Sequence, residues 1–296
     1  MLTAVVDLEE GPVHYADYGG EGEPLVVVHG IGGSYVNCSR LAPELTDRFH
    51  VYAPDLIGFG LTPLAGRDAS MASNQVMIGD FIAHVSGGPA TVVGHSMGGV
   101  LAMLLAAGDP PAVSRLVLLS PSVGPIRSPV ARASTSFLNM MARHPRVFAP
   151  LLRASVRQDT KGSVHATLRK YVRDLEDYDP FLVEAHVDLE RERCRTAGAY
   201  LGYLQAWRSM LEEAGDIEEF LKVVVNHVEV PTLLIQGAED LIVPVGFARQ
   251  AHGLRPDWSV VELPTVGHAP HMERPERTAE LILEWVSRLE SAATPR

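Results

Sequence analysis

The hydrophobic pattern of the first 120 residues alternates between two kinds of segment. Short continuous apolar runs are typical of strands buried on both faces of a sheet, and longer segments of helical periodicity separate them. The apolar runs lie at 25–28, 50–54, 90–93 and 114–120, and the helical segments at 41–48, 71–85 and 100–107. Residues 3–8 and 13–18 predict an opening hairpin. Strands that alternate with helices predict a mostly parallel sheet.

The middle third of the chain breaks this alternation. Residues 125–227 read as helices, over a length that exceeds any ordinary loop. Prolines suited to a first helical turn predict helix starts at Pro129, Pro145 and Pro180. Apolar runs resume at 231–236 and 259–263, and an amphipathic helix follows over 275–289. The pattern predicts a core domain of residues 1–124 and 228–296 with a helical cap domain, 125–227, inserted between its parts.

Composition narrows the class of protein. A chain of 296 residues with 46 % hydrophobic residues suffices for a large α/β core with an insertion. The net charge of −11 disfavours a nucleic-acid partner, because phosphate binding needs a basic surface. Cys38 and Cys194 lie far apart in sequence and predict neither a disulfide framework nor a zinc site. Without a leader pattern or an apolar run of membrane-spanning length, we expect a cytoplasmic protein with no membrane partner.

A candidate nucleophile stands where the run at 90–93 gives way to a helix. Residues 94–98 read G-H-S-M-G, the pattern G-x-S-x-G with Ser96 at its centre. A nucleophile on so tight a turn adopts strained backbone angles, and a side chain at Gly94 or Gly98 would collide with the neighbouring strand or helix. The helix that follows points its free N–H groups at the reacting centre, which favours negative charge there.

A second glycine-rich stretch, residues 29–33, follows the apolar run at 25–28. Alone, H-G-I-G-G is compatible with a flexible loop. Together with the serine turn it favours an oxyanion-hole loop, in which the N–H of Ile31 acts with the N–H of Met97.

As a set, these motifs resemble the α/β-hydrolase family, in its serine-nucleophile branch with a helical cap. The stretches that carry the resemblance are 29–33, 55–60, 94–99 and 267–268. It implies an α/β fold with a mostly parallel eight-stranded sheet, helices on both faces and an inserted helical cap. It implies no metal and no organic cofactor. One departure is Thr62, where members usually have serine; Asp55, near the end of its strand, is expected to brace its loop.

The resemblance also assigns the remaining catalytic groups. Residues 237–244 match the family pattern G-x-x-D-x-x-V-P, whose acid orients the histidine, so Asp240 is the expected acid and Glu239 the second candidate. His268 follows the last strand, which gives the chain order serine, acid, histidine. His271 in the same loop is the alternative base.

The substrate pocket is expected between the serine turn and the cap. Apolar cap residues, represented by Met140 and Trp207, are expected to face the nucleophile, while Gly30 and His95 border it from the core. The first half of the cap is rich in arginine. These arginines either lie on solvated helix faces, or one of them binds a carboxylate of the substrate.

Two reaction classes of the family fit these residues. Carbon–carbon bond hydrolases of carboxylate-bearing vinylogous diketones typically have a Gly-Pro-Gly loop, asparagine before the serine and tryptophan after the histidine, whereas this chain has Ile31, His95 and Ala269. We therefore expect a carboxylesterase for apolar short-to-medium acyl esters, with the carbon–carbon hydrolase as the alternative and a non-catalytic ligand-binding protein as the third hypothesis. The expected partner is a small-molecule substrate, and a homo-oligomer is compatible with the sequence.

Overall fold

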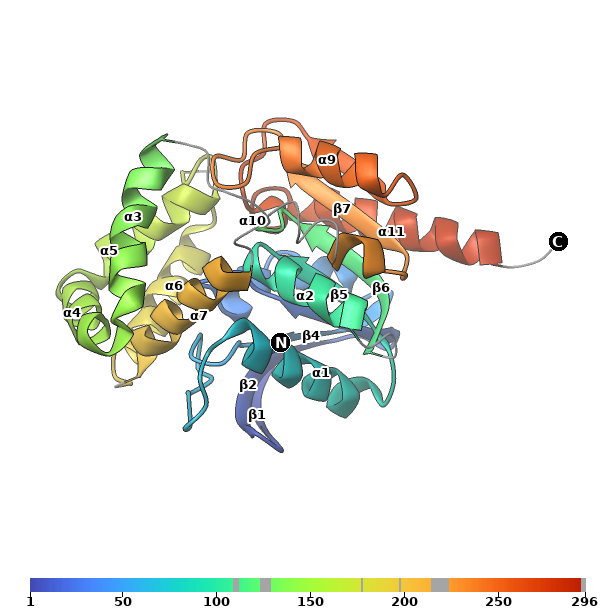
Figure 1. The fold of residues 1–296 in the computed structure, drawn as a ribbon. Coiled ribbons are helices and arrows are strands. Elements are labelled where there is room, and N and C mark those ends of the chain that lie inside the picture. Colours follow the sequence, from blue (N-terminus) through green and yellow to red (C-terminus); the bar gives the residue numbers. More distant parts are fainter. Residues whose placement is uncertain (109–111, 123–128, 177, 197, 214–223, 294–296) are drawn as a thin grey trace.

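An eight-stranded sheet forms the centre of the computed structural model (Figure 1), which describes residues 1–108, 112–122, 129–176, 178–196, 198–213 and 224–293. Its order is β1-β2-β4-β3-β5-β6-β7-β8. The first two strands form the predicted hairpin and pair antiparallel, and every pair from β4 to β8 is parallel. The strands are β1 Leu2–Leu8, β2 Gly11–Gly19, β3 Glu23–Val28, β4 Phe49–Pro54, β5 Ala90–His95, β6 Val113–Leu119, β7 Thr232–Gly237 and β8 Ser259–Leu263. The predicted fold class is confirmed.

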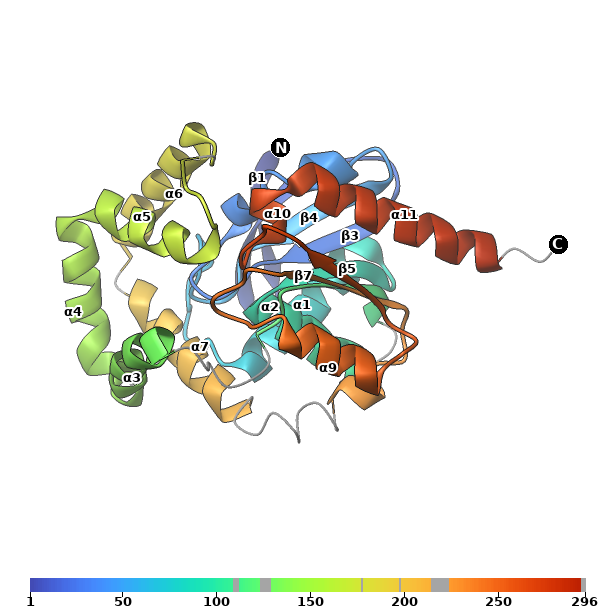
Figure 2. The same ribbon diagram turned by 90° about the horizontal axis from the view of Figure 1, so that it is seen from above.

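Apolar side chains alternate between the two faces of this sheet, which explains its continuous apolar runs. In β3, Val26 and Val28 belong to one buried cluster, and Leu25 and Val27 to another. Helices cover both faces, with α1, α2 and α9 on one side and α11 on the other (Figure 2). Their bounds are α1 Met71–Ser86, α2 Met97–Gly108, α9 Gly246–Leu254 and α11 Pro275–Ala293, and the short α10 spans Pro270–Glu273.

The helix expected over residues 41–48 is wrong in kind and length. The chain forms two short 3₁₀ helices, η1 Tyr35–Cys38 and η2 Ala42–Leu45. Pro43 stands in the first turn of η2, and the next backbone bonds, Thr46 N–H to Pro43 O and Arg48 N–H to Leu45 O, span three residues rather than four. This tighter winding lets the chain turn directly into β4.

Five helices that the structure describes from end to end between β6 and β7 form what we call the helical insertion. They are α3 Pro129–Arg143, α4 Pro145–Gln158, α5 Thr160–Tyr171, α6 Pro180–Arg193 and α7 Ala199–Glu213, and three of them begin at the prolines that predicted helix starts. Within the insertion α7 packs on α3 and α4, and α5 packs on α6. The insertion lies to one side of the sheet in both ribbon views (Figures 1 and 2).

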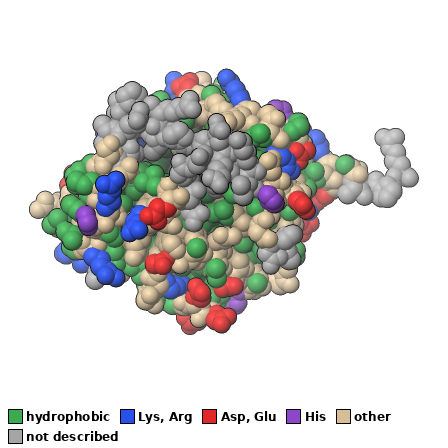
Figure 3. Space-filling model, in the orientation of Figure 1, with side chains coloured by type: hydrophobic (Ala, Val, Ile, Leu, Met, Phe, Trp, Pro, Cys, Tyr) green, Lys and Arg blue, Asp and Glu red, His purple; other side chains and the backbone are tan. Residues whose placement is uncertain are grey.

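The outer surface of the insertion mixes apolar and basic side chains. Phe137, Val147 and Leu151 are exposed on α3 and α4, and Figure 3 shows hydrophobic side chains beside Lys and Arg over this part of the molecule. Arg146 and Arg157 are also exposed, which fits solvated helix faces. Among the described helices, none is both long and apolar enough to cross a membrane.

Candidate active site

Ser96 alone connects β5 to α2, in a strained backbone conformation with φ of 54°. The turn is tight enough to require glycine on both sides. A Cβ at Gly94 would lie 2.4 Å from the carbonyl oxygen of Gly98, and one at Gly98 would lie 2.3 Å from that of Val28. The positive φ aims the Ser96 side chain away from the sheet, as expected for a nucleophile elbow.

His268 lies in hydrogen-bond contact with both Ser96 and Asp240. Its Nε2 is 3.0 Å from Ser96 Oγ, and its Nδ1 is 2.8 Å from Asp240 Oδ2. Because a carboxylate only accepts, Nδ1 carries the proton and Nε2 accepts the hydroxyl of Ser96. All three side chains are buried. The structure thus brings together the three residues that the sequence suggested as serine, acid and histidine.

Four donors fix the carboxylate of Asp240. Oδ1 accepts the N–H groups of Ile242 and Val243, each at 2.8 Å, and Oδ2 accepts the amide of Gln236 at 2.9 Å beside His268. Such a carboxylate cannot swing away from the imidazole. Glu239 points elsewhere, into an ion pair with Arg173 whose atoms lie 2.8 Å apart.

The glycine-rich loop lies directly against Ser96. A Cβ at Gly30 would come within 2.9 Å of Ser96 Cβ. A backbone bond of 3.0 Å from residue 33 to residue 30 closes a turn, and φ of 72° at Gly32 is typical of the third position of a type II turn. His29 Nδ1–H donates to the carbonyl of Gly30 over 2.7 Å and fixes the start of the loop. Ile31 is the second residue of this turn, and Met97 is the first of α2, whose initial N–H groups have no partner within the helix.

Two further histidines surround His268. The ring centroid of His95 lies 4.9 Å from that of His268 and 4.4 Å from that of His271, and His95 Nε2–H donates to the carbonyl of His268 over 3.0 Å. Burial lowers the pKa of His95 well below its usual value and that of His271 to about 3, so both rings are neutral at pH 7. Across the described residues, no group of three or more His, Cys, Asp and Glu is arranged to hold a metal ion.

Asp55 braces the loop after β4, as predicted. Its carboxylate is fully buried and accepts the N–H groups of Tyr35 at 2.7 Å and Leu61 at 2.9 Å, together with His14 Nδ1–H at 2.8 Å. The hydroxyl of Thr62 accepts the N–H of His14 over 2.9 Å. Thr62, which stands where members of the family usually have serine, therefore has a structural role.

Comparison with known proteins decides the family. The family model described as alpha/beta hydrolase fold matches residues 23–275. The chain belongs to this family.

Relatives of this hydrolase include more than one reaction class. A pimeloyl-[acyl-carrier protein] methyl ester esterase of Aromatoleum aromaticum is 30 % identical over 273 residues, which cover 87 % of this chain and 96 % of the relative. A 2-hydroxy-6-oxo-6-(2'-aminophenyl)hexa-2,4-dienoic acid hydrolase of Metapseudomonas resinovorans is 26 % identical over 277 residues, 91 % of this chain and 86 % of the relative.

A solved structure, a putative lipase of Acinetobacter baumannii, superposes on this hydrolase with a TM-score of 0.76 at 22 % identity, covering 98 % of this chain and 92 % of the lipase. The names of the relatives support a hydrolytic enzyme, and they include both an esterase and a dienoic acid hydrolase.

Ser122 is a neighbour of Ser96 that the sequence analysis missed. Its Oγ lies 2.8 Å from Ser96 Oγ, and its N–H donates to the carbonyl of Ser96 over 3.1 Å. Since the proton of Ser96 goes to His268, the hydroxyl of Ser122 donates to Ser96. The only signal in the sequence was a serine shortly after β6.

Met140 lies on α3 and Trp207 on α7, both in the insertion. The side chain of Met140 is 44 % exposed on α3. Trp207 on α7 is buried, and its Nε1–H donates to Asn139 Oδ1 over 2.7 Å. A role for either residue in binding substrate stays a prediction.

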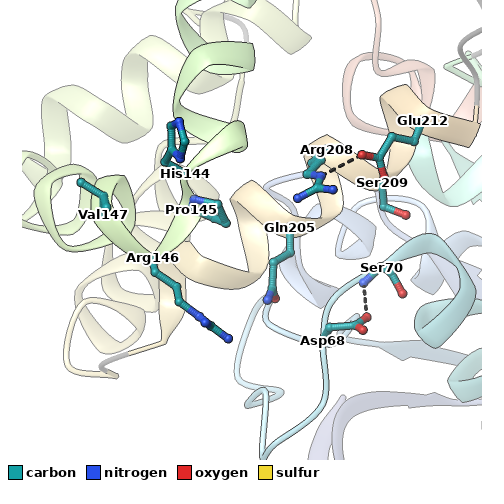
Figure 4. Close-up of a pocket in the computed structure, with 10 residues that line it drawn as sticks. All are labelled: Asp68, Ser70, His144, Pro145, Arg146, Val147, Gln205, Arg208, Ser209 and Glu212. Carbon is teal, nitrogen blue, oxygen red and sulfur yellow. Dashed lines mark hydrogen bonds and ion pairs between the residues drawn. The ribbon is translucent and has the colours of Figure 1, made fainter.

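A separate cavity of about 520 Å³ lies where the insertion meets the core (Figure 4). It is bounded by the loop before α1, the start of α4 and one face of α7, and none of the candidate site residues lines it. Eight of its ten lining residues are polar or charged, and an ion pair joins Arg208 to Glu212 inside it. Beside it, Ser209 Oγ accepts the N–H of Met71 over 3.0 Å, which attaches α7 to the core.

Proposed function

We propose that this hydrolase is a serine carboxylesterase that forms an acyl-enzyme on Ser96 and takes esters of apolar short-to-medium acyl groups. One observation carries the proposal. The hydroxyl of Ser96 donates to His268, and His268 donates to Asp240, over 3.0 and 2.8 Å. A hydroxyl, an imidazole and a fixed carboxylate in this sequence activate a serine for attack on a carbonyl.

In the first half of the reaction, His268 Nε2 takes the proton of Ser96 while Oγ attacks the ester carbonyl carbon. The carbonyl oxygen becomes an oxyanion, which the N–H groups of Ile31 and Met97 bind. His268 then gives its proton to the departing alkoxide. The alcohol leaves, and the acyl group stays on Ser96 as an ester.

In the second half, His268 takes a proton from water as the water oxygen attacks the acyl carbon. The oxyanion that forms in this half is bound by the same N–H groups of Ile31 and Met97. Collapse of this tetrahedral intermediate releases the carboxylic acid, and His268 returns its proton to Ser96. Asp240 stabilises the imidazolium in both halves and keeps the proton on Nδ1.

The helical insertion has the role of a cap in this proposal, as part of a domain spanning residues 125–227. Gly30 and His95 border the reacting carbon from the core side, because both lie next to Ser96 in the fold. Met140 and Trp207 help to shape the acyl pocket. The esterase name of the Aromatoleum aromaticum relative supports the same class.

Carbon–carbon bond hydrolysis is the second candidate, and Arg193 is the observation that favours it. Arg193 is buried in the insertion, and its Nε has no hydrogen-bond partner among the described residues. Such a cation suits a substrate carboxylate. However, its other nitrogens already donate to Glu190 over 3.1 Å and to the carbonyl of Ala199 over 3.2 Å. A substrate carboxylate would compete with Glu190, so we favour the ester.

A direct comparison of the two substrate classes tests the proposal. The purified protein is assayed on 4-nitrophenyl esters of increasing acyl length and on a carboxylate-bearing ring-cleavage diketone. We expect the higher kcat/KM on an ester of short or medium length, and no turnover by Ser96→Ala. A far higher kcat/KM on the diketone than on every ester replaces this proposal by the second candidate.

A further inference from the structure

The segment of residues 171–173, at the end of α5, reaches from the helical insertion into the loops of the site. Tyr171 is the last residue of α5, and the chain then becomes extended at Val172, with φ of −106° and ψ of 141°. From this point the segment contacts three loops, which carry Ile31, Asp240 and His268. These loops hold most of the groups in the proposed mechanism.

The first contact is a side-chain hydrogen bond to the glycine-rich loop. The phenol of Tyr171 donates to the carbonyl of Ile31 over 2.8 Å. Burial raises the pKa of Tyr171 above its ordinary value, so the phenol keeps its proton and remains a donor at neutral pH. A Cβ at Gly32 would lie 3.7 Å from this hydroxyl oxygen, which places Tyr171 over the turn.

The loop needs a restraint of this kind because three of its four residues, 30–33, are glycine. Glycine has the largest backbone freedom of any residue, and one bond from residue 33 to residue 30 closes the turn. The hydroxyl of Tyr171 fixes the peptide that follows Ile31, so it restricts the backbone angles of the residue that supplies the N–H to the oxyanion. Oxyanion stabilisation depends steeply on where that donor lies.

The second contact joins the same residue to the base. The carbonyl of Tyr171 accepts the N–H of His268 over 3.1 Å, and the two ring centroids are 5.8 Å apart. One residue of the insertion therefore holds the oxyanion loop through its side chain and the base through its backbone.

The third contact fixes the register of the segment against the core. The N–H of Arg173 donates to Glu273 Oε2 over 3.0 Å, and Glu273 Oε1 accepts the N–H of Gly267 over 2.9 Å, one residue before His268. The guanidinium of Arg173 pairs with Glu239 at 2.8 Å, next to Asp240. These contacts keep Tyr171 in place between the two loops.

We infer that Tyr171 is a positioning residue for the oxyanion hole, which is fully formed only when the insertion holds residues 171–173 against the core. The inference rests on the proposed function. It adds that the insertion contributes to catalysis through the phenol of Tyr171, in addition to any part in shaping the pocket.

The test is Tyr171→Phe, which removes the hydroxyl and keeps the ring. On the best ester we expect kcat to fall by about tenfold, less than the loss of a whole oxyanion donor, with KM changed less than about twofold. A trifluoromethyl ketone, which becomes an oxyanion when Ser96 adds to it, should bind more weakly by the same factor as kcat/KM. Fluorophosphonate labelling of Ser96 should slow by a similar factor, and this readout requires no substrate.

Tyr203→Phe is the matched control. The ring of Tyr203 lies against the same glycine, 3.4 Å from the position of a Cβ on Gly32, and its hydroxyl makes no hydrogen bond in the part of the chain that the structure describes. We expect this variant to resemble the wild type within about twofold, since no buried hydrogen bond is lost.

Three outcomes overturn the inference: a wild-type labelling rate in Tyr171→Phe, an equal loss in Tyr203→Phe, or a lower melting temperature with unchanged ketone affinity. A wild-type protein that reacts with no ester, ketone or fluorophosphonate instead contradicts the proposed function itself. If the wild type is labelled at Ser96 but prefers the diketone, the esterase proposal fails. The labelling rates of Tyr171→Phe and Tyr203→Phe then decide the inference about Tyr171.

Discussion

Ser96 and Tyr171 reach the same site from two regions that are held in different ways. Ser96 lies between a central strand and its helix, with backbone bonds of 3.0 Å from its N–H to the carbonyl of Leu119 and from the N–H of Gly99 to its own carbonyl. Tyr171 is held by one side-chain bond and one backbone bond of its own. The neighbouring Arg173 adds a backbone bond to Glu273 and an exposed ion pair to Glu239, a kind of pair that contributes little stability. We infer that the core fixes Ser96, the proposed nucleophile, while the insertion adjusts the groups around it.

Ser96→Ala should give the largest effect and defines the core side of the comparison. Without the hydroxyl no acyl-enzyme forms, so we expect kcat to fall by several powers of ten, on the order of 10⁶. The fold should persist, because alanine is smaller and the turn is held by its backbone. Steady-state kinetics and thermal melts of the purified variant check this, and retained ester turnover contradicts the mechanism.

Asp240→Asn should cost on the order of 10⁴ in kcat, because an amide neither stabilises the imidazolium nor keeps the proton on Nδ1 of His268. Glu239→Gln is the matched control on the adjacent residue. Its carboxylate forms an exposed pair with Arg173, so only a few-fold change is expected. A larger loss in Glu239→Gln than in Asp240→Asn would show that the acid is assigned to the wrong residue.

Burying neutral histidines in the core should make the protein sensitive to acid. The pKa of His271 falls from 6.5 to about 3 on folding, so below pH 6.5 the unfolded chain binds a proton that the folded protein does not. Its contribution to stability is complete above pH 6.5 and is lost as the pH falls toward 3, at about 1.4 kcal/mol per pH unit.

His271→Gln removes this titration. The free energy of unfolding, measured with urea, should fall between pH 7 and pH 5 in both proteins. The fall should be about 2 kcal/mol smaller in the variant than in the wild type. Parallel losses in the two proteins would contradict the burial of a neutral ring at this position.

Ser122→Ala should reduce kcat by up to about tenfold, the value of one hydrogen bond to the reacting oxygen. Ser120→Ala is its control, because the buried hydroxyl of Ser120 has no hydrogen-bond partner among the described residues. Only the first variant should change the rate of Ser96 labelling. Equal effects would assign both serines to packing.

Substitutions in the insertion should act on substrate choice more than on chemistry. We expect Met140→Ala and Trp207→Phe to change the ratio of kcat/KM between medium and short esters by about tenfold, since a methylene contact in a pocket is worth about 1–3 kcal/mol at most. Phe137→Ala, which removes an exposed side chain from the same helix as Met140, is the control. Equal losses on all esters would indicate that these residues only hold the insertion together.

The sequence predicted the parts of the molecule that depend on short-range contacts. Gly94 and Gly98 are required by contacts across one tight turn, and the alternating burial of Leu25 and Val26 follows from a strand with two covered faces. The helix expected at 41–48 failed because a proline and the entry into β4 left room for a single 3₁₀ turn.

Contacts between distant segments could not be predicted in this way. Tyr171 and Ile31 are 140 residues apart, and nothing in the pattern around Tyr171 indicates that its hydroxyl meets a carbonyl of the glycine loop. Ser122 likewise gains its contact with Ser96 only because β5 and β6 are neighbours in the sheet. Polar side chains that position a site through tertiary packing leave no periodic signal.

Fluorophosphonate labelling followed by peptide mass spectrometry tests the central claim most directly. The account predicts one adduct per chain, on the peptide that contains Ser96, with no adduct in Ser96→Ala and a much slower reaction in His268→Ala. An unlabelled wild type, or a label that persists in Ser96→Ala on Ser122 or elsewhere, would contradict Ser96 as the nucleophile.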